Sequence, residues 1–402
     1  MAWDSAGGDL ALPVDVGSRD LNTDPGGRDA SLTVPEPAPD WMTRDHPVVV
    51  HMAFAFDIGD EIDLDQAREL LQGVLGKLPR RKRTPESIEY RPAPARVPVS
   101  LDGLRLPGTP RLAGDPRGEL TLFDFGAISL TARFPLVATP AELLELAGLL
   151  ADPAELTEAA RQLLQPWIDR LKPAVLDFDV SPLSEEYIVF QLAEHRGEWL
   201  EKHADWIAGL VRLEPEPLSP SEVREATRLW LSYTPDDLIV LDWAAGFVVD
   251  VDCAETLEVL EFANIQLLEF RHIDDRLDDR LEGSYRLIRP DRARRSWTRA
   301  WNIHGQAVRR VRELEIEATS VFERVDNSLK LIGDQYLVRV FELAAARFHL
   351  DGWQQSIRRK LETVGDVYDL LIQQAAGHRT EALEITIVLL IAVEIFLALV
   401  RY

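Results

Sequence analysis

Alternating apolar and polar stretches in the first two thirds of the chain predict strands separated by helices. Short apolar, β-branched runs predict strands over 47–56, 119–134, 175–179, 186–192 and 237–250. The run over 119–134 is either one long strand or a bulged pair with its bend at Gly126. Apolar residues spaced by three or four predict helices over 63–78, 139–150, 153–171, 195–210 and 219–231. A proline-punctuated segment over 91–101 suits only an edge strand. This order predicts an α+β domain over residues 46–252, related to the ferredoxin-like arrangement.

Beyond residue 253 the apolar spacing is helical. Apolar residues step by three or four from Leu257 to Leu281, and a seam with a mean step near the heptad value of about 3.5 follows over 291–350. The Asp351-Gly352 pair interrupts it, and a second seam continues towards Gly377. We therefore expect an antiparallel coiled-coil helical hairpin over residues 253–378. Seams of this length need partners, either within the chain or in another subunit, which predicts a homo-oligomer.

Residues 382–400 form an apolar run that would span roughly 28 Å as a helix, close to the ~30 Å core of a bilayer. This length predicts a C-terminal transmembrane helix. Two carboxylates interrupt the run, Glu384 and Glu394, and a carboxylate near the bilayer centre costs roughly 2.5–3.5 kcal/mol. We expect them to make polar contacts within the membrane, with Glu394 protonated or paired across a helix–helix contact. A helix in the core of an oligomer is the alternative.

The other end of the chain bears on where the protein would lie. Residues 1–45 are rich in Gly, Pro and Asp, which predicts a disordered acidic tail, and they lack the basic start and apolar centre of a signal peptide. Together with the apolar run at 382–400, this predicts a tail-anchored protein. It would be a single-pass protein of the lipid bilayer with its main domain in the cytoplasm.

Charge restricts the partners. The formal net charge is −24, so the chain as a whole repels nucleic acid and anionic lipid, and we expect no DNA partner. A single cysteine, Cys253, excludes an internal disulfide and fits a reducing compartment.

The charge reverses between residues 286 and 312, where arginines are interleaved with tryptophans. Arginine with aromatic side chains can bind RNA through phosphate contacts and stacking, so this segment is a candidate RNA, ribosome or partner contact. Alternatively, the tryptophans belong to the seam and the arginines pair with acidic residues elsewhere, or the segment binds anionic lipid. The candidate residues are Arg292, Arg294, Arg295, Arg299, Arg309, Arg310, Arg312, Trp297 and Trp301.

Motifs of familiar enzymes are missing from the sequence. It contains no Gly-rich phosphate loop, zinc-ligand spacing, Gly-x-Ser-x-Gly elbow or paired cysteines. Asp177 and Asp179 share one strand face, but no third metal ligand is visible near them in the sequence. His272 lies among acidic residues that could form a metal cluster, although a solvated helix face is the favoured interpretation. We predict a non-enzyme with no catalytic residue, metal or cofactor. A metal- or nucleotide-dependent enzyme is the less favoured alternative.

Three segments of the C-terminal third, over 325–336, 350–364 and 379–395, resemble the "required for meiotic nuclear division" family. The middle one begins Leu350-Asp-Gly-Trp-Gln-Gln. The family includes a mitochondrial translation factor, a yeast sporulation protein and bacterial members. The resemblance implies an α+β domain, a helical hairpin and a membrane helix. The mitochondrial member of the family forms large assemblies and supports organellar protein synthesis. We therefore predict a self-associating, tail-anchored membrane scaffold, with an RNA- or ribosome-contacting factor as the alternative.

Overall fold

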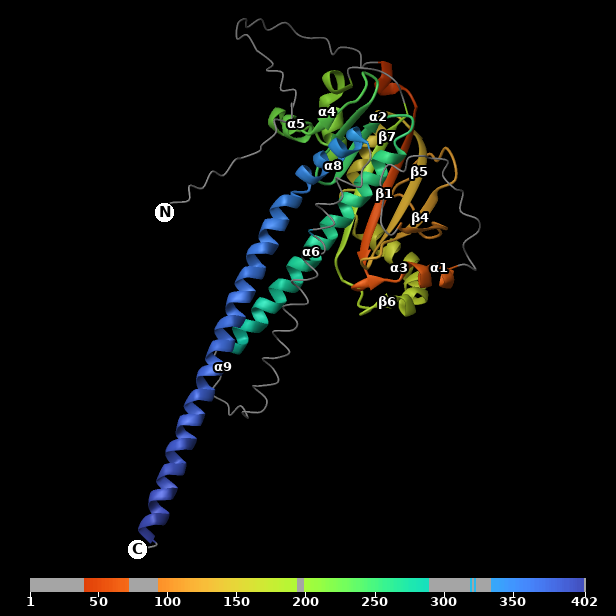
Figure 1. The fold of residues 1–402 in the computed structure, drawn as a ribbon. Helices are drawn as coiled ribbons and strands as arrows, with labels where there is room; N and C mark the ends of the chain where they lie inside the picture. The colour runs from red at the N-terminus through yellow and green to blue at the C-terminus, as the bar shows by residue number, and fades with distance from the viewer. Residues whose placement is uncertain are drawn as a thin grey trace, which may run out of the picture. The chain divides into compact units, whose positions relative to one another are not determined.

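A computed structural model describes residues 40–71, 93–193, 199–288, 319, 322 and 334–400 (Figure 1). Within its two longest helices the side chains at 280–288, 367–386, 389 and 398–400 are outside the description. The predicted tail lies largely outside these residues. A short 3₁₀ helix, η1 (Asp40–Thr43), precedes the first strand.

The centre of the molecule is an eight-stranded mixed sheet with the strand order β3-β4-β5-β1-β7-β10-β9-β8. Neighbouring strands are antiparallel except for β7 and β10, which are parallel. A second, two-stranded sheet pairs β2 with β6. The strands are β1 (His46–Asp57), β2 (Glu61–Ile62), β3 (Ala95–Val99), β4 (Arg117–Leu122), β5 (Ala127–Ala138), β6 (Val175–Leu176), β7 (Ser184–Leu192), β8 (Trp230–Leu231), β9 (Leu238–Leu241) and β10 (Ala245–Val249).

Helices cover both faces of the sheet. The helices are α1 (Leu64–Leu71), α2 (Pro140–Leu149), α3 (Ala154–Leu171), η2 (Lys172–Ala174), α4 (Trp199–Arg212), α5 (Pro220–Ala226), α6 (Ala254–Ile288), α8 (Gln335–Arg347) and α9 (Leu350–Val400). The first group, through α5, packs on one face, while α6, α8 and α9 share a second hydrophobic cluster on the other face.

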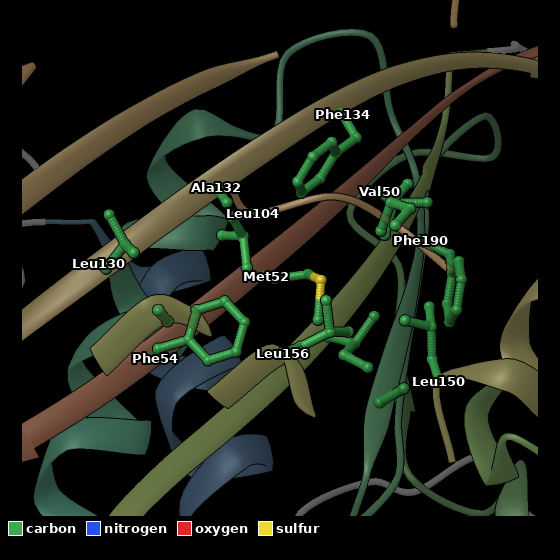
Figure 2. Packing of buried hydrophobic residues seen from close by; sticks show 14 of the residues in the cluster. Val50, Met52, Phe54, Leu104, Leu130, Ala132, Phe134, Leu150, Leu156 and Phe190 are labelled. Atoms are coloured by element: carbon green, nitrogen blue, oxygen red, sulfur yellow. The ribbon is translucent and has the colours of Figure 1, made fainter. Parts of the chain in front are cut away.

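Strand geometry assigns side chains to these two layers. Successive residues of a strand point to opposite faces, so Val50, Met52 and Phe54 of β1 enter the first core together with Phe190 of β7 (Figure 2). Tyr187 and Val189 of β7 point the other way and join the cluster beneath α6. The sheet is thus buried on both sides, as its long apolar runs predict.

The α+β class is confirmed, but the ferredoxin-like arrangement is wrong. The run over 237–250, predicted as one strand, is the hairpin of β9 and β10, because its apolar residues conceal a tight turn. The run over 119–134, predicted as one long strand or a bulged pair bent at Gly126, splits into the hairpin of β4 and β5. The four strands of these hairpins and strands β1, β3, β7 and β8 make up the eight-stranded sheet, in which β7 and β10 are parallel.

The prediction of a transmembrane helix over 382–400 is also wrong. Among the helices that the structure describes, none has a stretch long and apolar enough to cross a membrane. In the distal part of α9 the described side chains extend only from Ile387 to Leu397 and include Glu394, about half of the roughly 20 residues that a crossing requires. The predicted tail anchor and single-pass membrane localisation are wrong for the same reason, and the lipid-bilayer partner stays a prediction.

The helical hairpin differs from its prediction where the structure describes it. The seam over 291–350 is not one continuous helix, because Asp334 has extended backbone angles and caps a new helix, α8. The break before α9 falls at His349, which has a φ of 53°, rather than at Asp351-Gly352. Most of the seam over 291–350, the first helix of the predicted hairpin, lies outside the described residues. The described long helices, α6 and α9, lie side by side and leave the sheet in the same direction (Figure 1).

The turn between β4 and β5 depends on Gly126. Its φ is +93°, and a Cβ atom there would lie 1.6 Å from the Gly59 carbonyl oxygen. We expect Gly126→Ala to lower the free energy of unfolding by about 3–5 kcal/mol, because backbone strain and a backbone clash add together. Chemical denaturation measures this loss.

Gly103 provides the matched control. Its φ is +97°, but a Cβ atom would meet nothing within 4 Å, so Gly103→Ala isolates the cost of strain, about 1–3 kcal/mol. Equal losses in the two variants would contradict the close approach of the two loops.

Candidate functional site

Helix α6 lies between the sheet and the C-terminal helices α8 and α9, and it supports both of them. From Val259 to Phe270 its side chains are buried on all sides. One side packs on β1, β5 and β7, and the other on α8 and α9. A helix buried so completely is held rigidly, so it can fix the position of whatever packs on it.

Polar contacts fix α6 against the ends of the strands. The Asn264 side-chain amide donates a hydrogen bond to the Glu185 carbonyl oxygen at 3.3 Å, and the Arg271 guanidinium pairs with the Glu185 carboxylate. The His272 Nδ1 atom lies 3.2 Å from Ser181 Oγ. Burial raises the pKa of Glu185 to about 7, although Arg271 opposes the shift.

A buried ion-pair cluster ties α8 to the sheet. Asp242, in the turn between β9 and β10, is fully buried and pairs with Arg347 of α8. Arg212 at the end of α4 supplies a second guanidinium, with Nε 2.7 Å from Asp242 Oδ2. The Tyr187 hydroxyl donates to the Asp242 carbonyl oxygen at 3.0 Å, and Arg347 also reaches Glu225 at 3.3 Å. We call Asp242, Arg212 and Arg347 the arginine latch.

The other end of α8 is held by capping. The Asp334 carboxylate accepts hydrogen bonds from the backbone N–H groups of Tyr336, at 2.7 Å, and Leu337. The Tyr336 hydroxyl donates to Asp237 Oδ2 at 3.2 Å, which ties the start of α8 to the loop before β9. Both ends of α8 are therefore attached to the same hairpin.

Helix α9 begins on this support and then packs along α6. Ile357 and Val364, one heptad apart, are fully buried, as expected for the predicted second seam, and α6 is its partner within the chain. Lys360 Nζ lies 2.8 Å from Asp274 Oδ1 and 2.6 Å from Asp278 Oδ1 on α6. These contacts set the direction of α9.

The distal part of α9 exposes large apolar side chains. We call this the distal apolar segment. Each member is 46–66 % exposed, and neighbours are about 100° apart around a helix, so they face every direction. Its residues are Ile387, Val388, Leu390, Ile391, Val393, Ile395, Phe396 and Leu397. Such a surface is typical of a contact site rather than of a catalytic one.

The predicted polar contacts fall partly within this segment. Glu394 is exposed among its apolar residues, and Glu384 belongs to α9 with a side chain outside the description. The nine Arg and Trp candidates between Arg292 and Arg312 lie outside the described residues, so their RNA or ribosome contact stays a prediction.

Other candidate chemistry has structural roles here. Cys253 is buried, and burial raises the pKa of its thiol to about 12, which makes it unreactive. His272 Nε2 lies 3.9 Å from Asp57 Oδ1, and burial lowers the pKa of this imidazole. Across the described parts of the chain, no group of three or more His, Cys, Asp or Glu side chains could hold a metal ion.

The arginine latch could not be found from the sequence, because its members are far apart along the chain. Arg347 and Asp242 are 105 positions apart, and both look like solvated surface residues in their local context. The distal apolar segment, in contrast, is visible as an apolar run.

The fold and this site define an α+β protein in which a mixed sheet carries a long helical extension. Residues 48–255 match the family model "Uncharacterized protein MJ0711, N-terminal domain", and the chain belongs to this family. The match ends as α6 begins. Uncharacterized protein MJ0711 of Methanocaldococcus jannaschii is 26 % identical over 229 residues, which is 56 % of this chain and 69 % of that protein. No solved structure matches the chain. The resemblance to the "required for meiotic nuclear division" family stays a prediction.

The arginine latch gives a stability prediction. Arg347→Met leaves the buried Asp242 carboxylate with less compensation, so we expect the free energy of unfolding to fall by about 3–5 kcal/mol. Arg228→Met is the control, because Arg228 makes an exposed pair with Glu225 that contributes less than about 1 kcal/mol.

In the Asp242→Asn/Arg347→Met double variant we expect the free energy of unfolding to fall by less than the sum of the two single losses. Additive losses would argue against the latch.

Glu185 gives a pH prediction. Its pKa is raised from 4.5 to about 7, so its stabilising contribution is complete below pH 4.5 and is lost as the pH rises through 7. We expect the stability difference between Glu185→Gln and the wild type to move in favour of the variant between pH 5 and 7, by about 1–3 kcal/mol. Urea denaturation at several pH values measures it, and a pH-independent difference would refute the raised pKa.

Proposed function

We propose that the protein is a non-enzymatic assembly protein that associates with copies of itself through the distal apolar segment of α9. The observation that carries this proposal is the exposure of eight large apolar side chains on all sides of one helix. The proposal retains the self-association predicted from the seams and drops the membrane anchor.

The driving force is the removal of this surface from water. Full burial of a Leu, Ile, Val or Phe side chain contributes roughly 1.5–3 kcal/mol, and a helix that is apolar all round belongs in an interior. Several such side chains can together exceed the entropy lost on association, which is in the range of about 4–15 kcal/mol.

A second copy is the partner that suits this geometry. A groove covers one side of a helix, whereas a bundle of identical helices can cover all sides at once, and each copy brings the same segment. The exposed Glu394 supplies a polar position within the segment. Polar positions in helical bundles select register and subunit number, so this carboxylate would limit which bundle forms.

The rest of the structure supports presentation of the segment. The arginine latch fixes α8, and α6 aligns the start of α9 through buried contacts at Ile357 and Val364. A sheet attached to each helix would then be carried at a defined angle to the bundle, as expected of a scaffold.

The decisive variant is Ile391→Arg, which places a charge among the apolar side chains. We expect its self-association to weaken roughly 10- to 100-fold, because an apolar contact is lost and a charge must be buried. Sedimentation velocity of the full chain over a concentration series measures the change in mass.

Gln355→Arg is the matched control, since Gln355 is an exposed residue on the proximal part of the same helix. It adds the same charge and is expected to leave the mass distribution unchanged. A monomeric wild type at micromolar concentrations, or equal effects of the two variants, would refute the proposal.

A further inference from the structure

A buried carboxyl lies where α6 meets strands β4 and β5. Glu261 of α6 is 7 % exposed, and the opposing residues Thr121 and Ser129 are 0 % exposed and face each other in the β4–β5 ladder. Their hydroxyls lie close enough to favour the ionised carboxyl. Yet Glu261 Oε1, Thr121 Oγ1 and Ser129 Oγ are buried and meet hydrogen-bonding geometry with none of the described residues.

The nearby positive charge is already shared. Arg96 on β3 places Nη1 3.3 Å from Glu119 Oε1 and 3.2 Å from Glu258 Oε1. If Glu261 were ionised as well, this one guanidinium would face three carboxylates from β4 and α6. Glu119 disfavours the ionised form of Glu261, and Arg96 and the two hydroxyls favour it.

Desolvation decides the balance. Burial raises the pKa of Glu261 above its ordinary value of 4.5, against the opposing effects of Arg96, Ser129 and Thr121. A neutral carboxyl avoids placing a further negative charge beside Glu119 and Glu258, and its O–H group can donate to one of the two hydroxyl oxygens.

We propose that protonated Glu261, together with Thr121 and Ser129, holds α6 against strands β4 and β5, and that α6 loosens from the sheet when this carboxyl ionises. We call these three residues the clamp. The consequence reaches beyond the clamp, because α8 and α9 pack on α6. Phe341 of α8 lies against Phe262, the residue next to Glu261, at a ring-centroid distance of 6.1 Å. Proton loss would therefore weaken the support of the C-terminal helices, whatever those helices bind.

Hydrogen–deuterium exchange of the full chain tests this clamp at several pH values between 5 and 8, after correction for the intrinsic pH dependence of exchange. In the wild type we expect the opening constant of α6 to rise up to tenfold per pH unit across the transition, because one proton is released on opening. In Glu261→Gln, which mimics the neutral carboxyl, α6 should stay protected. Helix α3, on the opposite face of the sheet, is the internal reference.

Ser129→Ala gives an independent arm that keeps the titrating group. This hydroxyl favours the ionised carboxyl, so its loss should shift the transition of α6 to higher pH. Glu185→Gln removes another buried carboxyl that contacts α6 and should leave the part of the transition due to Glu261 in place. Equal pH dependence of α6 in the wild type and Glu261→Gln, or an unshifted transition in Ser129→Ala, would overturn the proposal.

Discussion

The structure depends on the burial of one helix from two sides. Helix α6 has the sheet on one side and α8 and α9 on the other, so it serves both layers of that half of the molecule. An ordinary surface helix can keep one polar stripe in water. The middle of α6 has no solvent-exposed face, so polar and apolar side chains are buried together there. The buried polar residues are Glu261, Asn264, Gln266 and Glu269. Enclosed polar groups must find partners or lose charge, and this requirement gives α6 its unusual chemistry.

Much of the fold is readable from local patterns. The strands over 47–56 and 186–192 correspond to β1 and β7, because each is a single buried run of strand length. The helices over 139–150 and 153–171 correspond to α2 and α3, and a complete capping box at Thr139 and Glu142 marks the start of α2. Strand order was not readable, since pairing between distant strands leaves no periodic signal in either one.

The errors have specific physical causes. A turn with apolar neighbours does not interrupt an apolar run, so the turn at Asp242-Trp243 was read as continuous strand. The bend at Gly126 was predicted, but as a bulge within a long strand rather than as the turn between β4 and β5. An apolar helical run has the same composition whether a bilayer or other protein surrounds it, and the sequence alone does not separate the two. The arginine latch and Glu261 were missed for a third reason, because a charged residue carries no local sign that tertiary packing will bury it.

The separation of Asp242 and Arg347 also bears on synthesis of the chain. Their pairing spans 105 positions, and a ribosome adds roughly 5–20 residues each second, so Asp242 would wait about 5–20 s for its second guanidinium. During that interval Arg212 alone can compensate the carboxylate in the turn after β9. The edge of the sheet formed by β8, β9 and β10 would therefore be completed late, and a nascent chain would reach its full stability only once α8 has left the ribosome.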